Sequence, residues 1–391
     1  MDLKINLFKY LLILLSLCMS VSCEDEHDIG IQLKKTQLFS LDKSLNSETT
    51  NLDINRFIKL EKAVILEFPE NFAIQNIHKI IVSEPSMFIL DNVQNFIFVY
   101  DLEGNFLNRI GGIGDGPGEY LEITDFTITN DDLVVFSNNS RKIIHYSSIG
   151  KFIKEFPILH YGSSLAVFDQ GYIIQTKNNV HPQMPYDLLF LNNSGEMVDQ
   201  KQQAYPNFPS FESSGFLKNV SAGKILYMNV FGNIIYQVNE ELDLIPLYKF
   251  DLGSDALHMD KFDNPQELSN HFHEFTHLTN LYWENDSLAL LYFHHDLRRL
   301  FGLVSKSEGC LYTFNQFEKN EILDVLRSIK AADIDDDKLI ISTHPIFNLS
   351  EHNFDLIDSL VDWGPNVKNQ SNKREVIENS NGLVFIMDVI N

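Results

Sequence analysis

Histidines concentrate in one short stretch of the chain, and their spacing could support metal chemistry. His271, His273 and His277 follow a His-x-His-x3-His pattern, and imidazole nitrogens are frequent ligands of Zn²⁺. If residues 265–278 form a helix, His273 and His277 lie one turn apart on one face. However, the His-Glu-x-x-His motif is absent, and an adjacent pair at 294–295 would point to opposite faces of a strand. We therefore interpret the histidines as scattered polar or core residues: no metal site is favoured, no cofactor is predicted, and the three remain low-ranked candidate ligands.

A glycine-rich run at 111–118 has the composition of a phosphate-binding loop. Such loops need a following helix whose N-terminus holds the anion. Here Pro117 lies inside the run, a strand is expected to follow, and no Lys-Ser/Thr pair is present. We interpret the run as a connection between sheets in which glycine permits positive φ and close backbone approach. Asp115 and Glu119 are kept as the alternative, a pair of ligand contacts in this loop.

Acidic residues dominate the charge of the chain. Asp and Glu number 54 against 30 Lys and Arg, for a formal net charge of −24. Because such a surface repels phosphate backbones and no basic cluster compensates it, nucleic acid is not expected as a partner. Asp335-Asp336-Asp337 suggests calcium, but the ligand spacing and closing Glu of an EF-hand are absent, so a hairpin turn is predicted.

The N-terminus has the features of an export signal. Lys4 and Lys9 precede an apolar run at 11–18, which is too short to span a bilayer as a mature helix. Ser20-Val21-Ser22-Cys23 resembles a lipobox, although Ser20 replaces the usual aliphatic residue. We predict cleavage before Cys23 and lipid attachment to its thiol, with an ordinary secretory signal as the alternative. Because Cys18 lies in the leader, only Cys310 remains, which excludes a disulfide framework; we expect Cys310 to be buried.

These features divide the chain into three parts: a lipoprotein signal peptide at 1–22, a lipidated Cys with a flexible tether at 23–55, and a folded domain at 56–391. The tether is polar and begins with Glu24-Asp25-Glu26. This acidic cluster resembles the surface-export signal of Bacteroidota lipoproteins. We therefore expect a cell-envelope protein anchored to the outer membrane, with surface exposure indicated by the cluster.

The folded part contains an internal repeat. Tyr100, Gly104 and Phe106 recur 46 residues later as Tyr146, Gly150 and Phe152. Weaker copies follow near Gly195, Glu240 and Gly309, the last delayed by an insertion of about 20 residues near 254–275. Each copy has the pattern of a β-hairpin with a polar turn between alternating strands.

A second hairpin precedes each copy, so each repeat holds four strands. Six upstream turns are found at 84–85, 130–132, 169–171, 222–223, 284–286 and 335–337. Four-stranded units of 40–50 residues are typical of propeller blades, which must stack on their neighbours to bury both faces. We predict an all-β fold, a six-bladed β-propeller with four-stranded antiparallel blades. Residues 63–66 and 383–387 would share the last blade and close the ring. A seven-bladed ring using 344–381 and a β-sandwich with a separate tail are the alternatives.

The segment from Gly104 to Phe126 carries a family resemblance. It contains Arg109-Ile110-Gly111, then Gly116-Pro117-Gly118-Glu119-Tyr120 and Asp125-Phe126. This order resembles the six-bladed β-propeller lipoproteins of Bacteroidota, relatives of NHL-repeat proteins. The resemblance is specific at 100–126 and architectural over about 57–390. It implies the fold and the envelope location, because the activity of that family is largely undefined.

Two tripeptides, at 286–288 and 358–360, read Asp-Ser-Leu. They resemble the acceptor for O-glycosylation in Bacteroidota, so Ser287 and Ser359 are candidate modification sites. Between 350 and 381, apolar residues at three- and four-residue spacings predict a short amphipathic helix. We expect this helix to cover one end of the propeller, with a lid over the central channel as the functional alternative.

Function is predicted at the level of class only, because fold alone does not fix activity. The expected role is a ligand- or partner-binding module for a glycan, a peptide or an envelope complex, since propellers present rigid loop faces and an axis. The partners expected are therefore the membrane, through the lipid, and one such ligand. The alternative is a metal-assisted lyase or hydrolase of the NHL-like propeller type, with the histidines at 271–277 as ligands. A catalytic role is the less favoured of the two, and a purely structural role stays open.

Overall fold

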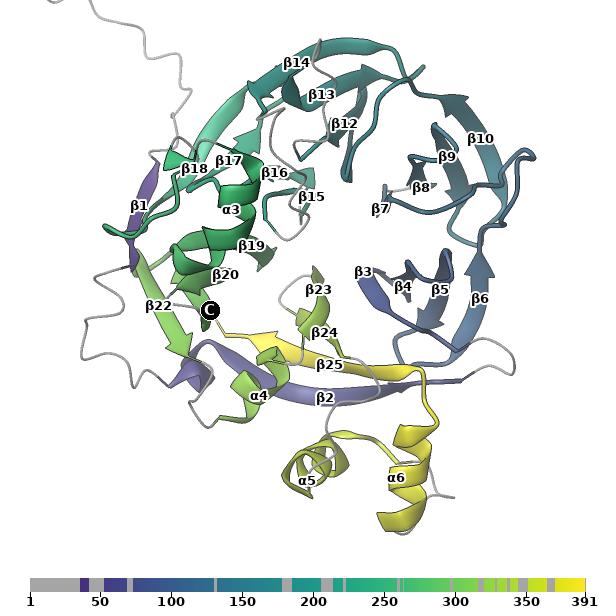
Figure 1. Cartoon of the computed structure of the whole chain (residues 1–391). Coiled ribbons are helices and arrows are strands. Elements are labelled where there is room, and N and C mark those ends of the chain that lie inside the picture. Colours follow the sequence, from purple (N-terminus) through teal and green to yellow (C-terminus); the bar gives the residue numbers. More distant parts are fainter. Residues whose placement is uncertain are drawn as a thin grey trace, which may run out of the picture. The chain divides into compact units, whose positions relative to one another are not determined.

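A computed structural model gives the structure of the protein (Figure 1). It describes residues 36–41, 53–68, 73–129, 132–177, 185–204, 214–220, 223–258, 261–262, 264–295, 298–315, 320–327, 329–335, 338–343, 351–363 and 370–390. The predicted leader and Cys23 lie outside these residues. The propeller belongs to the compact unit that begins at Thr36.

The described residues form six sheets that surround a common axis (Figure 1). Numbered from the first complete repeat, blade 1 holds β3 (Ile77–Ser83), β4 (Ser86–Asp91), β5 (Phe96–Asp101) and β6 (Phe106–Ile110); blade 2 holds β7 (Asp125–Ile128), β8 (Asp132–Ser137), β9 (Lys142–Ser147) and β10 (Phe152–Pro157); blade 3 holds β11 (Ser164–Phe168), β12 (Gly171–Gln175), β13 (Tyr186–Asn192) and β14 (Met197–Gln203). Blade 4 holds β15 (Phe216–Asn219), β16 (Ile225–Met228), β17 (Ile234–Val238) and β18 (Leu244–Asp251); blade 5 holds β19 (His277–Glu284), β20 (Leu288–His295), β21 (Arg298–Ser305) and β22 (Cys310–Asn315); blade 6 holds β23 (Ile329–Asp335), β24 (Lys338–Thr343), β25 (Gly382–Val389) and β2 (Ile58–Leu66). The prediction of a six-bladed propeller is confirmed.

The repeat arises from the turns that the sequence predicted. Each of the six upstream turns joins the first two strands of a blade, and the repeated glycines join the last two. Gly104 and Gly150 have φ of +88° and +82°, a conformation that side chains with a Cβ disfavour. A Cβ on Gly104 would lie 2.4 Å from the carbonyl oxygen of Ile65. Glycine at this turn therefore also permits the close approach of blade 6.

The two ends of the domain close the ring in blade 6, as predicted. β2 is the outermost strand and pairs antiparallel with β25, with Ala63 opposite Phe385. Asn381, just before β25, ties this blade to blade 1: its Nδ2 donates to the Tyr100 hydroxyl at 2.9 Å, and its Oδ1 accepts from the Ile74 amide at 2.8 Å. Chain ends far apart in sequence are thus joined by a sheet and by a buried side chain.

The core lies between the blades, because each sheet buries both faces against its neighbours. Phe88 and Val99 of blade 1 pack with Phe126 and Ile144 of blade 2 in one buried cluster. Similar clusters join the other neighbouring blades. The propeller is stabilised by a series of such interfaces around the axis.

The N-terminal segment adds a strand that was not predicted. β1 (Gln37–Ser40) pairs in parallel with β18 and makes blade 4 five-stranded, although these residues fall within the stretch expected to be a tether. Phe39 is buried and its ring stacks on Phe250 at 5.7 Å. The strand has four residues, and its two apolar residues, Leu38 and Phe39, are adjacent instead of alternating. It therefore gives little periodic signal, which explains why sequence reasoning missed it.

Helices occupy the insertions. They are η2 (Ile54–Arg56), α3 (Pro265–His271), η5 (Phe272–Glu274), α4 (Glu321–Arg327), α5 (Glu351–Leu360) and α6 (Gln370–Glu378). None of the helices in the described part of the chain is long and apolar enough to cross a membrane.

Helix α5 confirms the predicted amphipathic helix, but it does not lie where the helix was expected. Its Phe354 and Ile357 pack with Phe385 of β25, and Val361 forms a bridge to Ala63 of β2. Figure 1 shows α5 and α6 at the outer edge of blade 6, beyond β2. The expectation that the helix covers one end of the propeller, or forms a lid over the channel, is therefore wrong, as is the seven-bladed alternative.

Candidate functional site

The predicted histidine ligands fall on three different elements. His271 ends α3, His273 lies in η5, and His277 begins β19, so no continuous helix places His273 and His277 on one face. His271 Nδ1 lies 3.1 Å from a Glu274 carboxylate oxygen at the surface. Within the described ranges, no three His, Cys, Asp or Glu side chains are arranged to hold a metal ion. The arrangement gives the candidate ligands no common site.

His277 instead stacks on His294, one of the pair expected on a strand. Their ring centroids are 5.2 Å apart with an interplanar angle of 14°, and Phe231 meets His277 edge-on at 5.1 Å. Burial is the main reason why the pKa of His277 is lowered to about 4; its hydrogen bond to the Phe275 carbonyl opposes the shift and the neighbouring His294 adds to it. Burial also lowers the pKa of His294. The two imidazoles are therefore neutral near pH 7 and belong to the packing between blade 5 and the insertion.

The glycine-rich loop is the connection between blades 1 and 2 that the sequence predicted. It leads into β7, not into a helix, and Ile113 forms a bridge with Tyr120 across it. Glu119 Oε2 accepts a hydrogen bond from the Gly116 amide at 2.9 Å, so this carboxylate holds its own loop. Asp115 is exposed. As ligand contacts, Asp115 and Glu119 stay a prediction.

The two candidate glycosylation sites are at accessible positions. Ser287 is half-buried in the turn between β19 and β20, and Ser359 is exposed on α5, where its hydroxyl donates to the Leu356 carbonyl at 2.7 Å. Their modification stays a prediction. Cys310 is exposed in the outer strand β22, so the expectation of a buried thiol is wrong. It directly follows the hairpin turn at Gly309, where side chains face solvent.

The inner strands of the blades present a different group of polar side chains. In each sheet the first strand pairs on one side only, and its other edge faces the axis. Main-chain groups on such an edge need other partners. Side chains from neighbouring blades supply them, and five such residues bond to main-chain groups of the inner strands. We call Lys79, Asp125, Lys218, Asn219 and Asp333 the inner-ring polar cluster.

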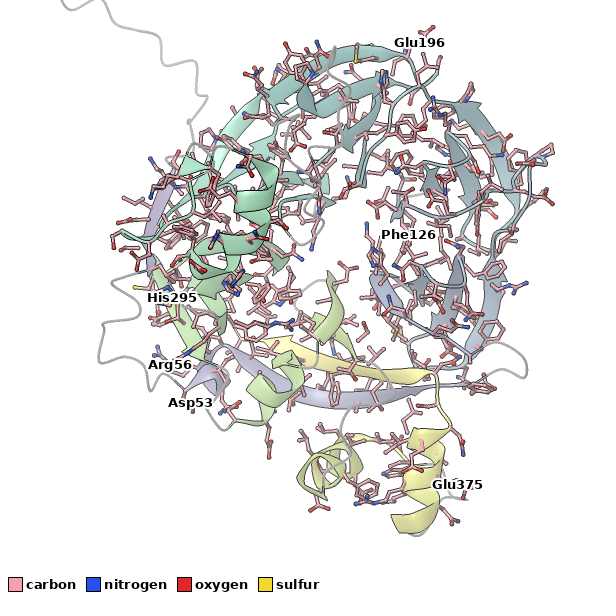
Figure 2. The ribbon with its side chains drawn as sticks, viewed as in Figure 1. Asp53, Arg56, Phe126, Glu196, His295 and Glu375 are labelled. Carbon is pink, nitrogen blue, oxygen red and sulfur yellow. The ribbon has the colours of Figure 1, made fainter. Side chains whose placement is uncertain are left out.

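Lys79 on β3 connects blade 1 to blade 2. Its ammonium group lies 2.8 Å from Asp125 Oδ1 and donates to the Phe126 carbonyl at 2.7 Å. Asp125 Oδ2 in turn accepts from the Leu165 amide of blade 3 at 2.7 Å. Figure 2 shows Phe126 beside the centre of the ring, next to β3 and β7. Three consecutive inner strands are thus linked through one ion pair.

Asn219 and Asp333 make equivalent connections elsewhere in the ring. Asn219 on β15 accepts from the Val167 amide at 3.0 Å and donates to the Val167 carbonyl at 2.8 Å. Asp333 on β23 accepts from the Val82 amide at 2.7 Å, which joins blade 6 to blade 1. These bonds hold polar side chains at fixed positions around the axis.

Lys218 differs from the other members. Its ammonium group donates to the main-chain carbonyl of Leu281 on β19, and it forms no ion pair within the described part of the chain. Burial is the main reason why its pKa is lowered to about 7; Lys79 and Lys177 act in the same direction, whereas Asp333 and Asp125 oppose the shift. Lys218 is half-buried as a residue. A lysine held inside a fold without a paired carboxylate is costly, and such groups concentrate at functional sites.

Sequence reasoning did not single out this cluster. Asp125 appeared only as part of the family motif, and Lys79 and Lys218 did not enter the sequence analysis. A signal was nevertheless present, because Lys79 and Lys218 directly precede or follow apolar residues of buried inner strands, at positions where lysine is rare. Only the closed ring shows that they meet.

The fold and the cluster define the protein as a six-bladed β-propeller with a polar, mixed-charge inner ring. The chain belongs to the family described as a domain of unknown function, DUF4934, whose model matches residues 37–387. No curated protein matches the chain.

Two crystal structures show the same fold. A candidate exported protein from Bacteroides fragilis is 16% identical with a TM-score of 0.70, over 90% of this chain and 99% of that one. A member of the DUF4221 family from Bacteroides vulgatus is 11% identical with a TM-score of 0.52, over 85% of this chain and 99% of that one. At these identities the similarity concerns the fold.

Proposed function

We propose that the protein is a lipid-anchored module of the bacterial cell envelope that binds a glycan, a peptide or a partner protein. The anchor rests on the leader at 1–22 and on Cys23, which follows it in a lipobox-like sequence. The similarity in fold to a candidate exported protein of Bacteroides fragilis is consistent with this location. Residues between the anchor and Thr36 would connect the propeller to the outer membrane.

Binding is supported by the inner-ring polar cluster. Lysines and aspartates from four blades are brought to the axis: Lys79 from blade 1, Asp125 from blade 2, Lys218 from blade 4 and Asp333 from blade 6. Hydrogen bonds to neighbouring strands already restrain these side chains, so a ligand would cost little further side-chain entropy. A rigid set of donors and acceptors is suited to recognising a polar ligand.

The binding role predicts the effect of removing one lysine of the cluster. We expect the full chain to bind at least one member of a panel of envelope-derived glycans and peptides, measured by isothermal titration calorimetry. Lys79→Met removes the ion pair with Asp125 and should weaken that binding about 10-fold or more, since buried charged hydrogen bonds contribute above 1.4 kcal/mol. The exposed Lys59→Met on β2 serves as control and should bind normally. Equal binding by both variants would place the ligand elsewhere.

The anchor predicts a difference between two neighbouring cysteines. Cys23→Ser should abolish incorporation of a radiolabelled fatty acid and move the protein from the membrane fraction to the soluble fraction, because one thiol carries the lipid. Cys18→Ser, a change five residues earlier in the leader, should leave labelling and fractionation unchanged. Loss of labelling in Cys18→Ser, with retention in Cys23→Ser, would contradict the assignment.

The alternative of a metal-assisted lyase or hydrolase is not proposed. It depended on a shared site for His271, His273 and His277, and these residues lie on α3, η5 and β19 with separate partners. No arrangement among the described residues favours it over binding.

A further inference from the structure

Lys218 is the member of the inner-ring polar cluster whose charge is least compensated. Lys79 lies 2.8 Å from the carboxylate of Asp125. The Lys218 ammonium group has three protons to donate, and the acceptor it reaches is the uncharged carbonyl of Leu281. Within the described part of the chain no carboxylate lies within ion-pair distance of it. Lys79 is therefore paired with a carboxylate, whereas Lys218, whose pKa it influences, is bonded to an uncharged carbonyl.

Charged side chains of both signs act on Lys218. Lys79 and Lys177 are the cations that act on it, and Asp125 and Asp333 are the anions. Asp125 is already engaged by Lys79 and by the Leu165 amide. Lys218 is thus a cation of the inner ring with no carboxylate of its own among the described residues, in a chain whose formal net charge is −24.

The negative surface does not remove this local preference. Exposed charges more than about 8 Å away are largely screened at physiological ionic strength, whereas charges inside the ring are screened much less. A small anion at the axis would respond mainly to the charges of the inner strands, among which Lys218 has no paired carboxylate in the described part of the chain. The net charge of the chain would slow its approach more than it would weaken its binding.

Oxygen atoms on β19, the strand whose main chain Lys218 contacts, indicate what else the ligand carries. Thr279 and Asn280 immediately precede Leu281 on β19, and their side-chain oxygens are buried with no hydrogen-bond partner in the described structure. An unsatisfied buried oxygen costs free energy that a donor would recover. After a rotation of either side chain, a hydroxyl group could donate to it. Inorganic anions offer no such set of hydroxyl groups.

We infer that the inner-ring polar cluster binds an acidic saccharide, a sugar whose carboxylate pairs with the Lys218 ammonium group and whose hydroxyls donate to oxygens of the inner strands. This inference rests on the proposed binding function and specifies its ligand class. A charge-assisted hydrogen bond between carboxylate and ammonium is about twice as strong as a neutral one. The carboxylate would supply the counter-charge that the chain itself does not place beside Lys218.

The test compares D-glucuronate with D-glucose, which differ by the carboxylate. The full chain is titrated with each sugar while the pH titration of the Lys218 ε-CH₂ group is followed by NMR, with the signal assigned by its loss in Lys218→Met. We expect glucuronate to move the titration midpoint to higher pH and glucose to leave it in place. Lys218→Met should weaken glucuronate binding about 10-fold or more, and Lys59→Met should not.

The outcomes separate this inference from the proposed function. If glucuronate leaves the Lys218 titration unchanged while another ligand binds and is lost in Lys79→Met, the acidic saccharide is wrong and the binding role stands. If acetyl-alanyl-alanine shifts the titration and glucuronate does not, the site recognises a peptide carboxylate and the saccharide is again wrong. If neither probe shifts it and no panel member binds, both proposals fail.

Discussion

Lys218→Met is expected to make the protein more stable at pH 7 while it removes the proposed ligand contact. In the folded chain burial lowers the pKa of Lys218 from 10.5 to about 7. One pKa unit corresponds to about 1.4 kcal/mol, so keeping the charged amine in the ring costs up to about 5 kcal/mol. Because the side chain is partly exposed and its bond to the Leu281 carbonyl is lost, we expect a net gain of about 2 kcal/mol.

The same shift fixes how the stability of the natural protein depends on pH. The folded pKa lies below the unfolded value, so the unfolded chain binds the proton more readily. The destabilising effect of the Lys218 charge is therefore absent above pH 10.5, and stability is lost as the pH falls toward 7. Urea unfolding at pH 7 and pH 10 measures this. The natural protein should gain stability between the two, relative to Lys218→Met.

Lys59→Met provides the matched control, because Lys59 is an exposed lysine of strand β2. It should change stability by less than about 0.5 kcal/mol at either pH. If Lys218→Met instead destabilises the protein at pH 7 as a core truncation would, the lysine supports the ring through its hydrogen bond, and the stability cost assigned to its charge is wrong. A gain in stability together with a loss of ligand binding is the pattern expected of a binding residue.

The architecture could be predicted because its signals are local and repeated. A turn such as Glu84-Pro85 or Gly104 specifies a hairpin from a few residues, and six blades multiply that signal. Ring closure followed from a general argument: an unpaired final sheet would leave an exposed edge, and residues 63–66 were available to cover it. The same reasoning failed for β1, which consists of four residues and pairs in parallel with a strand more than 200 residues away.

The inner-ring polar cluster could not be predicted in the same way. Lys79, Asp125 and Lys218 occupy different repeats, and the repeated positions do not carry the same residue type. What brings them together is the registration of neighbouring blades around the axis, which depends on packing between sheets. The histidines illustrate the opposite error: close spacing in sequence suggested one site, but the chain changes from helix to strand between His273 and His277.

The stacked histidines predict a loss of stability in mild acid. Burial and His294 hold the pKa of His277 at about 4, below the value of 6.5 that it has when exposed. Between pH 6.5 and about 4, the unfolded chain therefore binds a proton at His277 that the folded chain does not bind. The contribution of His277 is complete above pH 6.5 and is lost as the pH falls to about 4. The shift corresponds to about 3 kcal/mol.

The charges around the pair act in the same direction. His273, His295 and Arg299 each lower the pKa of His294. Protonation of His294 would therefore be opposed by its neighbours, and protonation of His277 would place a positive charge between the aromatic rings of Phe231 and Phe272. Since η5 packs against β20 at this point, the first region to open in acid should be the insertion that contains α3.

His277→Phe tests this with a side chain of similar shape that cannot titrate. The free energy of unfolding is measured with urea at pH 7 and at pH 4.5. Its decrease between the two pH values should be about 2–3 kcal/mol smaller in this variant than in the natural protein. His258→Gln, at an exposed histidine of the same insertion, should retain the natural pH dependence. Hydrogen exchange at pH 4.5 should show residues 265–275 opening before the blades. An unchanged pH dependence in His277→Phe would mean that the stacked pair accepts its proton without disturbing the fold.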